Sequence, residues 1–419
     1  MGKKILNKQW VAIDIGTSKI CTLIAGLDLN GNIEILGLGQ HPSYGLKKGV
    51  VVDINSTVKS IKKSVVDAEN MAGIKVESAI IGISGGHISS INSQGIVPIK
   101  KGDVSQRDID RVIDAAKAVP IPDDREILHV FPQYFKVDGQ ECLNESLGMK
   151  GVRLETQVHI ITGSITSASN LIKCCEDSEI AVDDIVLETI ASAEATLSET
   201  EKELGIGMVD IGAGTSDFAI YKDGKILHSK VVPVAGNHFT RDLAIGLRIP
   251  LEAAENVKRK YGNVNCKSAF NFENSTIKVD IGNLGEHKFI NIKDIHEILR
   301  PRAEELFDFI IDEIIKFNLK KFMPFGLVIT GGGGMLAGIK DLAEERFNMP
   351  VRIGYPQNNL KSKGFEFVPD VLKSPIYSTG YGLLLYGASG KDLTLAQSVN
   401  EKGMTKVFDR MKSWIYDLF

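Results

Sequence analysis

A motif that occurs twice constrains the fold of this chain more than any other feature. The first copy lies at residues 11–18 and the second at 208–217. In each copy an apolar run reaches an aspartate, Asp14 or Asp210, and a turn rich in glycine and hydroxyl side chains leads into a second apolar run. Short apolar runs bounded by such turns are typical of buried strands. The repetition predicts two similar half-domains that face each other.

The segments around the two copies predict an α/β fold. Apolar runs joined by short turns, including Asn30-Gly31 and Asp223-Gly224, predict a meander of strands after each aspartate. In the first half we expect strands at 10–13, 20–27, 33–38 and 79–83 and a helix at 55–71. After residue 163 we expect strands at 185–187, 206–210, 218–222, 225–234 and 326–330, further strands within 263–292, and helices at 189–197, 241–261 (broken at Pro250), 294–317 and 375–386.

Residues 84–163 depart from this pattern and predict a small inserted α+β subdomain. The segment begins with an alternation of apolar and polar residues over 88–99 and continues with one helical stretch at 105–118. After a proline-rich stretch it returns to strand-like patterns near 127–137 and 155–162.

The composition excludes several classes of protein. The formal net charge is −4, whereas nonspecific nucleic-acid binding needs a basic surface, so nucleic acid is not an expected partner. No apolar run reaches the roughly 18 residues of a membrane span, and the first residues lack the apolar stretch of a secretion signal. The five cysteines include no Cys-x-x-Cys pair, which argues against a disulfide framework or a zinc site and favours a reducing cytoplasm.

The repeated turns have the chemistry of a phosphate site. Glycine lets backbone N–H groups approach phosphate oxygens, and hydroxyl groups add further donors. The two aspartates, Asp14 and Asp210, suit the outer shell of a hydrated Mg²⁺ ion, held through water. The alternative for each turn is an ordinary tight hairpin. The candidate phosphate ligands are Gly16, Thr17, Ser18 and Lys19 in the first turn and Gly212, Ala213, Gly214 and Thr215 in the second.

A third glycine cluster follows the predicted strand 326–330. Gly331, Gly332 and Gly333 lead to Met335, and a strand that enters a helix through glycines can let a flat adenosine lie against bare backbone. No Gly-Lys-Ser/Thr follows, so the cluster is not a P-loop. The alternative is a flexible turn.

Together the three clusters resemble the phosphate-1, phosphate-2 and adenosine motifs of the actin, Hsp70 and sugar-kinase superfamily. Within it the chain resembles the FtsA family, the bacterial cell-division actin homologues, and the resemblance covers nearly the whole chain. The stretches that carry this closer resemblance are 45–53, 68–73, 82–88, 350–354 and 377–383.

The resemblance implies an actin-like ATPase fold with ATP and Mg²⁺ between two lobes, each with a ribonuclease-H-like core. It implies that Glu194 orients the attacking water, although an ordinary polar helix residue is the alternative. It also implies that Glu255, Lys258 and Arg259 contact adenosine, with a solvated charged helix face as the alternative. Catalysis is expected to be a slow Mg²⁺-dependent ATP hydrolysis at most.

The same resemblance predicts the domain division. The first lobe core comprises 9–83 with 164–199 and 370–388, and the inserted subdomain is 84–163. The second lobe core comprises 200–228 and 301–369, and its peripheral subdomain is 229–300. A flexible linker at 389–403 and an amphipathic helix at 404–419 complete the chain.

The last sixteen residues carry one apolar stripe at helical spacing with basic residues beside it. Such a helix is typical of a membrane interface, and the alternatives are a helix docked on its own domain or a coiled-coil seam. The predicted membrane contacts are Val407, Phe408, Met411, Trp414, Ile415, Leu418 and Phe419.

The function implied by the resemblance is that of a polymerising adaptor of bacterial cell division. It would tether FtsZ filaments to the cytoplasmic face of the plasma membrane at the septum, as a peripheral membrane protein. Expected partners are the FtsZ C-terminal peptide on the second lobe, further copies of the chain in a filament, lipids at the C-terminal helix, and other division proteins on the inserted subdomain. The alternatives are the actin-like ATPase of type IV pilus assembly and a small-molecule kinase of the same superfamily.

Overall fold

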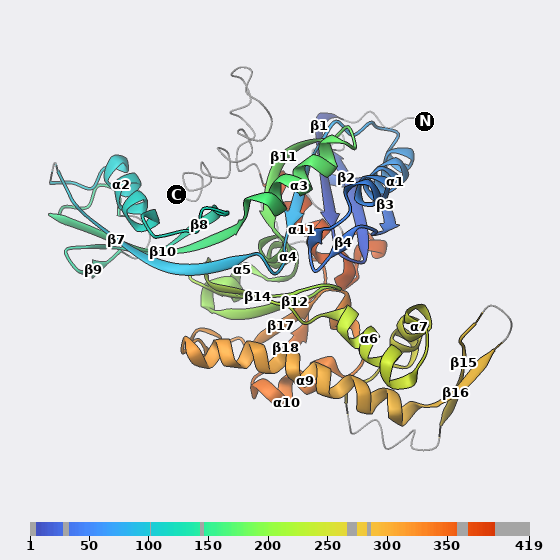
Figure 1. Ribbon diagram of the computed structural model, residues 1–419. Helices are drawn as coiled ribbons and strands as arrows, with labels where there is room; N and C mark the ends of the chain where they lie inside the picture. Colours follow the sequence, from blue (N-terminus) through green and yellow to red (C-terminus); the bar gives the residue numbers. More distant parts are fainter. Residues whose placement is uncertain are drawn as a thin grey trace.

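The computed structural model describes residues 6–27, 33–100, 102–142, 146–265, 275–282, 286–357 and 368–389. Two five-stranded sheets form the centres of two lobes, and a four-stranded sheet extends to one side of them (Figure 1). In Figure 1 the first sheet lies at the upper right, the second lies below it, and the four-stranded sheet points to the left.

The first sheet is a meander extended by two parallel strands. Neighbours in the meander β1-β2-β3 pair antiparallel, whereas β6 pairs parallel with β1 and β11 pairs parallel with β6. The order across the sheet is β11-β6-β1-β2-β3. The strands are β1 Leu6–Ile15, β2 Lys19–Leu27, β3 Ile33–Pro42, β6 Ser78–Ile83 and β11 Ala181–Leu187.

The second sheet repeats this topology. Its meander β12-β13-β14 is antiparallel, and β17 and β18 add in parallel beside β12, so that the order is β14-β13-β12-β17-β18. The strands are β12 Ile206–Ile211, β13 Ser216–Lys222, β14 Lys225–Val232, β17 Leu327–Thr330 and β18 Val351–Ile353. The predicted pair of similar half-domains is confirmed, and Asp14 and Asp210 lie at equivalent ends of β1 and β12.

Two helices join the sheets through a shared core. Helix α4 (Glu188–Thr196) packs against α11 (Ser378–Ala388), whose residues are all buried except Thr379. Helix α11 contacts β1 and β2 of the first sheet, and α4 contacts β12 and β13 of the second. One apolar cluster therefore contains residues of both sheets together with both helices. Burial of this much apolar surface makes the junction the firm connection between the lobes.

The remaining helices cover the outer faces of the sheets. Helices α1 (Ile54–Ala72) and α3 (Ile165–Glu176) pack on the first lobe. The Asp53 side chain caps α1 by accepting from Ser56 N, and Gly73 ends it in the left-handed region. The second lobe is covered by α6 Gly236–Leu247, α7 Leu251–Tyr261, α9 Ile292–Lys316 and α10 Ile339–Phe347.

The predicted insertion is also present. Its sheet has the order β7-β10-β8-β9 and carries helix α2 (Gln106–Lys117). The strands are β7 Ser89–Pro98, β8 Arg125–Val137, β9 Gln140–Glu141 and β10 Arg153–Ser164. Near the base of the insertion β7, β8 and β10 contact β14 of the second lobe.

Some sequence predictions need correction or lie outside the described residues. Helix α3 and the short α5 (Glu199–Leu204) were not predicted. Among the residues of 263–292 that the structure describes (263–265, 275–282 and 286–292), the strands are β15 (Thr276–Asp280) and β16 (His287–Asn291). The glycines after β17 form a 3₁₀ turn, Gly332–Met335, and α10 begins only at Ile339.

Three predictions lie outside the described residues. They are the Asn30-Gly31 turn, residues 390–403 of the predicted linker, and the amphipathic helix 404–419 with its seven membrane contacts. Within the described part of the chain, no helix has the length and apolar character to cross a bilayer.

Candidate functional site

The two repeated turns meet face to face. In the first turn Gly16 N donates to Lys19 O at 3.1 Å, and in the second Gly212 N donates to Thr215 O at 3.0 Å, so both close with the same hydrogen bond. A Cβ atom at Gly214 would lie 2.5 Å from Thr17 Oγ1. Only glycine at position 214 lets the turn of the second lobe approach the turn of the first this closely.

Four carboxylates surround this meeting point. Asp14 and Asp210 come from the ends of β1 and β12, Asp217 from β13, and Glu188 from the first residue of α4. The three aspartates are buried. Lys19 Nζ lies 3.1 Å from Asp14 Oδ2 and balances one of the four negative charges.

The electrostatics of the cluster follow from crowding and burial. Burial, and then the charge of Asp14, raise the pKa of Asp210 to about 6 against the hydrogen bond from Ser192. Burial and the charge of Asp210 raise the pKa of Asp217 to about 7. Burial and the three aspartates raise the pKa of Glu188 well above its ordinary value. A site with this excess of carboxylate suits a cation bound among them.

The pKa of Lys19 is also raised, but here the cause is an opposite charge. Burial alone would lower the pKa of the Lys19 amine, but the Asp14 carboxylate and its hydrogen bond raise it above the ordinary value. Lys19 is therefore charged at neutral pH, and its charge is shared with Asp14.

Hydrogen bonds from three elements fix the aspartates. Ser192 of α4 donates to Asp210, and Thr379 of α11 donates to the same Oδ2 atom at 3.3 Å. Ser84, at the end of β6 in the first lobe, donates to Asp217 in the second lobe at 2.8 and 2.9 Å to its two oxygens. The carboxylates thus tie the two lobes together at the floor of the site.

The third glycine cluster lies directly beside Asp210. Gly331 has φ +80°, and a Cβ atom there would lie 2.1 Å from Asp210 Oδ1. A Cβ atom at Gly333 would likewise clash with the side chain of Ile211. A Cβ atom at Gly332 would lie 3.6 Å from Ile376 Cγ2, which is an ordinary contact. The side chain of Met335 is 58% exposed. The backbone of Gly331 and Gly333 therefore packs directly against the end of β12.

Helix α7 brings its charged side chains to the second turn. Lys258 Nζ donates to Gly236 O at 3.1 Å and lies 2.7 Å from Glu255 Oε2, and Gly236 N donates to Gly212 O at 3.0 Å. Arg259 Nε lies 2.7 Å from Glu255 Oε1 with its side chain mostly exposed. The structure therefore brings Glu255 and Lys258 to the predicted site, and Arg259 to its rim.

The structure does not bring Glu194 to the cluster. Glu194 Oε1 lies 2.9 Å from Lys202 Nζ, and its charge raises the pKa of Tyr221, after burial. Tyr221 pairs with Ile206, at the opposite end of β12 from Asp210. Helix α4 instead presents Glu188 to the aspartates, which the sequence prediction missed. A carboxylate at the junction of a buried strand and a helix was the available signal.

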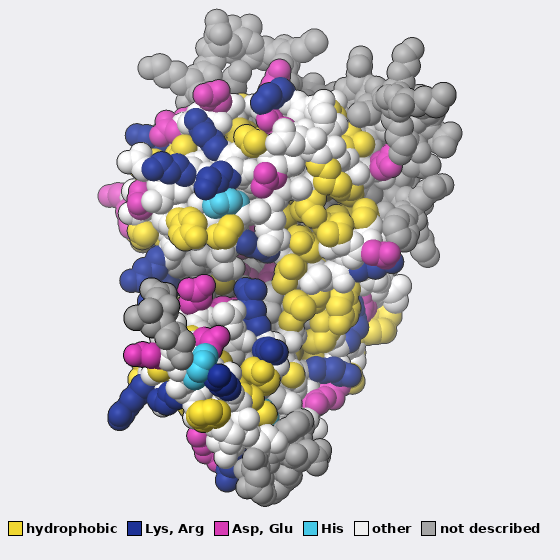
Figure 2. Space-filling view, turned by 90° about the vertical axis from the view of Figure 1, so that its right-hand side faces the viewer, with side chains coloured by type: hydrophobic (Ala, Val, Ile, Leu, Met, Phe, Trp, Pro, Cys, Tyr) yellow, Lys and Arg dark blue, Asp and Glu magenta, His cyan; other side chains and the backbone are white. Residues whose placement is uncertain are grey.

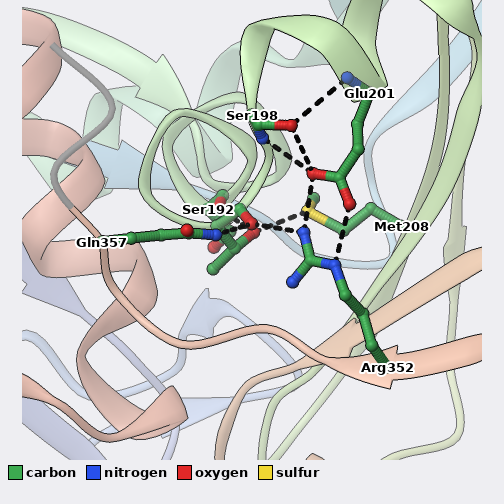
Figure 3. Close-up of polar contacts among 7 residues, drawn as sticks. Ser192, Ser198, Glu201, Met208, Arg352 and Gln357 are labelled. Carbon is green, nitrogen blue, oxygen red and sulfur yellow. Dashed lines mark hydrogen bonds and ion pairs between the residues drawn. The ribbon is translucent and has the colours of Figure 1, made fainter. Parts of the chain in front are cut away.

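The far end of α4 is held to the second sheet (Figure 3). Arg352 of β18 binds Glu201 through Nε and Nη2, each at 2.8 Å. Arg352 Nη2 and Gln357 Nε2 also donate to Thr196 O, at 2.8 and 2.7 Å. Glu188, Ser192 and Thr196 follow one face of the helix at spacings of four, so this attachment fixes how α4 presents Glu188 and Ser192.

The face in Figure 2, which is the right-hand side of Figure 1, has a hollow between an upper and a lower part, with Lys and Arg side chains at its edges and a hydrophobic area beside it. Among the described residues, no group of three His, Cys, Asp or Glu side chains is arranged to coordinate a metal directly. The carboxylates fit a cation held through water better than one bound in a closed cage.

Comparison with known proteins identifies the family. The chain is 43% identical to the cell division protein FtsA of Pseudomonas aeruginosa over 419 residues, which cover 99% of each protein. It is 34% identical to the FtsA of Escherichia coli K12 over 91% of this chain and 90% of that protein. The chain belongs to the FtsA family. The family model described as cell division protein FtsA matches residues 207–382, and the model of the SHS2 domain inserted in FtsA matches 85–162.

Solved structures confirm the actin-like fold of this FtsA family member. The PilM-PilN type IV pilus biogenesis complex is similar with a TM-score of 0.65 and 17% identity, over 90% of this chain and 98% of that one. MreB5 of Spiroplasma citri bound to ADP gives 0.56 and 15% identity, over 91% and 97%. The same protein bound to AMPPNP gives 0.54 and 15%, over 92% and 98%. At these identities the likeness shows the fold alone, and family membership comes from the FtsA relatives.

Proposed function

We propose that this protein is an ATP-binding, polymerising adaptor of cell division that tethers FtsZ filaments to the cytoplasmic face of the plasma membrane. The observation that supports nucleotide binding most directly is the pair of equivalent turns, one from each lobe, that meet above buried carboxylates. The structural neighbours bound to ADP and AMPPNP share this fold and support the same assignment.

The residues around the meeting point divide into three groups. The phosphates would be held by the backbone and hydroxyl groups of residues 16–19 and 212–215. Adenosine would lie between Gly331–Gly333 with Met335 on one side and Glu255, Lys258 and Arg259 on the other. A Mg²⁺ ion would be held through water by Asp14 and Asp210, where it supplies charge neutralisation for the phosphates.

Glu188 is the residue best placed to act on water. It replaces Glu194 in this proposal, because Glu188 faces Asp14, Asp210 and Asp217 while Glu194 pairs with Lys202. Burial and the three aspartates raise the pKa of Glu188, which makes its carboxylate a stronger base toward a water beside the terminal phosphate. A cation bound among these groups would favour the ionised, accepting form.

The proposal is tested by nucleotide titration of the full chain. We expect tight binding of fluorescent ATP with Mg²⁺, and at least about tenfold weaker binding in the Asp14→Asn, Asp210→Asn double variant, because two charge-assisted contacts are lost. Asp223→Asn, in an exposed turn of the same meander, is the control and should bind as the wild type does. Equal binding by the double variant, or none by the wild type, would reject the site.

The adaptor role draws on family membership and on exposed apolar residues. On the second lobe, Ile245 of α6 and Phe289 of β16 are 76% and 72% exposed, and Lys288 Nζ donates to Leu247 O at 2.6 Å, which keeps these elements side by side. An FtsZ C-terminal peptide would dock there, other division proteins would bind the inserted subdomain, and further copies would add to a filament.

The membrane role rests on residues 404–419. A single amphipathic helix binds a bilayer reversibly, and many helices on one filament bind far more firmly. Sedimentation with anionic vesicles should therefore pellet the full chain with ATP and leave a variant ending at residue 403 in solution. Equal pelleting of the two forms would rule out the tail as the anchor.

A further inference from the structure

A short hairpin lies across the line where the two phosphate turns meet. It consists of β4 (Leu46–Lys47) and β5 (Val50–Val51), with Lys48 and Gly49 at its tip. Gly49 N donates to Thr17 Oγ1 of the first turn at 3.0 Å. The ideal Cβ position of Gly214, in the second turn, is 2.9 Å from Lys48 Cα. The backbone of Lys48 is thus fixed against both turns at once.

The side chain of Lys48 brings an available positive charge to this place. It is exposed, and no hydrogen bond or ion pair of its amine is found within the described part of the chain. Its charge contributes, after burial, to the lowered pKa of His238, on α6 just beyond Gly236. Lys19 in the first turn and Lys258 beside the second are already paired with Asp14 and Glu255.

A triphosphate bound at this site would need a positive charge near its terminal phosphate. The adenosine elements, Gly331–Gly333 and α7, lie on the second lobe, and phosphates extending from them lead toward the contact between Thr17 and Gly214. The printed neighbours of that contact are a hydroxyl group and backbone atoms, and the nearby aspartates at the strand ends repel a phosphate. The backbone of Lys48 is held at this contact, whereas its amine is unpaired within the described residues. The amine can therefore bind the terminal phosphate as a compact positive charge.

We propose that Lys48 binds the terminal phosphate of ATP and thereby distinguishes ATP from ADP. This inference rests on the proposed nucleotide site. The hairpin also links the nucleotide site to the insertion. The ideal Cβ of Gly49 is 2.7 Å from Ser84 O and 2.8 Å from Gly85 Cα, where the insertion begins.

Calorimetric titration of three variants with Mg·ATP and Mg·ADP tests the inference. Lys48→Ala should weaken ATP binding by about tenfold or more and ADP binding by less than about twofold, because a hydrogen bond to a charged group is removed from one ligand only. Lys48→Arg should recover most of the ATP affinity. Lys47→Ala, one residue away on the same exposed hairpin, should match the wild type for both nucleotides.

The outcomes separate the two proposals. If the wild type binds neither nucleotide, the proposed site itself fails. If the wild type binds both but Lys48→Ala loses nothing, or loses ATP and ADP equally, the nucleotide site stands and the role of Lys48 is overturned. Thermal unfolding of each variant excludes misfolding, and the recovery in Lys48→Arg provides a second check because it restores charge without restoring lysine.

Discussion

At the scale of single residues, the candidate site is a group of acids held together against their repulsion. Ser84, Ser192 and Thr379 donate hydrogen bonds to Asp217 and Asp210, and these bonds offset only part of the cost of burying the charges. The folded chain therefore stores destabilising electrostatic energy at this site, and ligand binding can release it.

The raised pKa of Asp217 predicts that the free energy of unfolding depends on pH. The pKa of Asp217 is about 7 in the folded chain and about 4 when unfolded, so the folded state binds the proton more tightly. The free energy of unfolding should then fall as pH rises from about 4 to about 7. Each tenfold difference in proton affinity between the folded and unfolded states corresponds to about 1.4 kcal/mol. In urea unfolding without nucleotide, Asp217→Asn should show a shallower fall than the wild type.

Asp223→Asn is the matched control for this measurement, because Asp223 is an exposed aspartate that follows the same strand. Its pH profile should follow the wild type. An equally steep fall in Asp217→Asn would mean that Asp217 is ionised in the folded chain throughout this range.

At the scale of elements, local sequence signals decided which predictions succeeded. Helix α1 was predicted within one residue at each end, because an aspartate cap and a glycine stop lie beside its apolar face. Helix α3 was missed because it buries Ala168, Cys174 and Cys175 along with longer residues, and small side chains blur the helical period. Glu194 was chosen by likeness of sequence, which does not say which turn of α4 reaches the phosphate turns.

The attachment of α4 to β18 should make a measurable contribution to stability. Arg352→Gln removes two hydrogen bonds to Glu201 and leaves that half-buried carboxylate without its cation, so a loss of about 1–3 kcal/mol is expected at pH 7. Although burial raises the pKa of Glu201, Arg352 and Ser198 lower it overall. The contribution of the pair should therefore be full above pH 5 and fade as pH falls below about 4.

Urea unfolding at pH 7 and at pH 3.5 checks this expectation. Lys340→Gln is a suitable control, because Lys340 forms an exposed pair with Glu344 in α10 at 3.7 Å, and such pairs contribute little. A loss in Arg352→Gln no greater than that in Lys340→Gln would show that the attachment does not stabilise the helix.

At the scale of the whole molecule, the insertion is a further connection between the lobes. It begins and ends in the first lobe, between β6 and β11, yet its base is bonded to β14 of the second. Ser90 Oγ donates to Ser229 O at 2.6 Å, and Gln133 Nε2 donates to Leu227 O at 2.7 Å. His159 Nε2 lies 2.8 Å from Ser229 Oγ. This contact adds to the links between the lobes made by the core around α4 and α11 and by the hydrogen bonds from Ser84 to Asp217.

This contact of the insertion predicts a specific effect of Ser229→Ala. Burial lowers the pKa of His159 to about 3, so its ring is neutral, and removing the Ser229 hydroxyl leaves the buried Nε2 atom unpaired. Leaving a buried polar atom unpaired costs about 1–3 kcal/mol, and that cost should appear as faster hydrogen exchange in β14 and β10. The exchange of β1 and β2, on the far side of the α11 core, should stay at the wild-type rate. Ser93→Ala on β7 is the control, and a uniform rise across all sheets would show loss of global stability instead of release of the insertion.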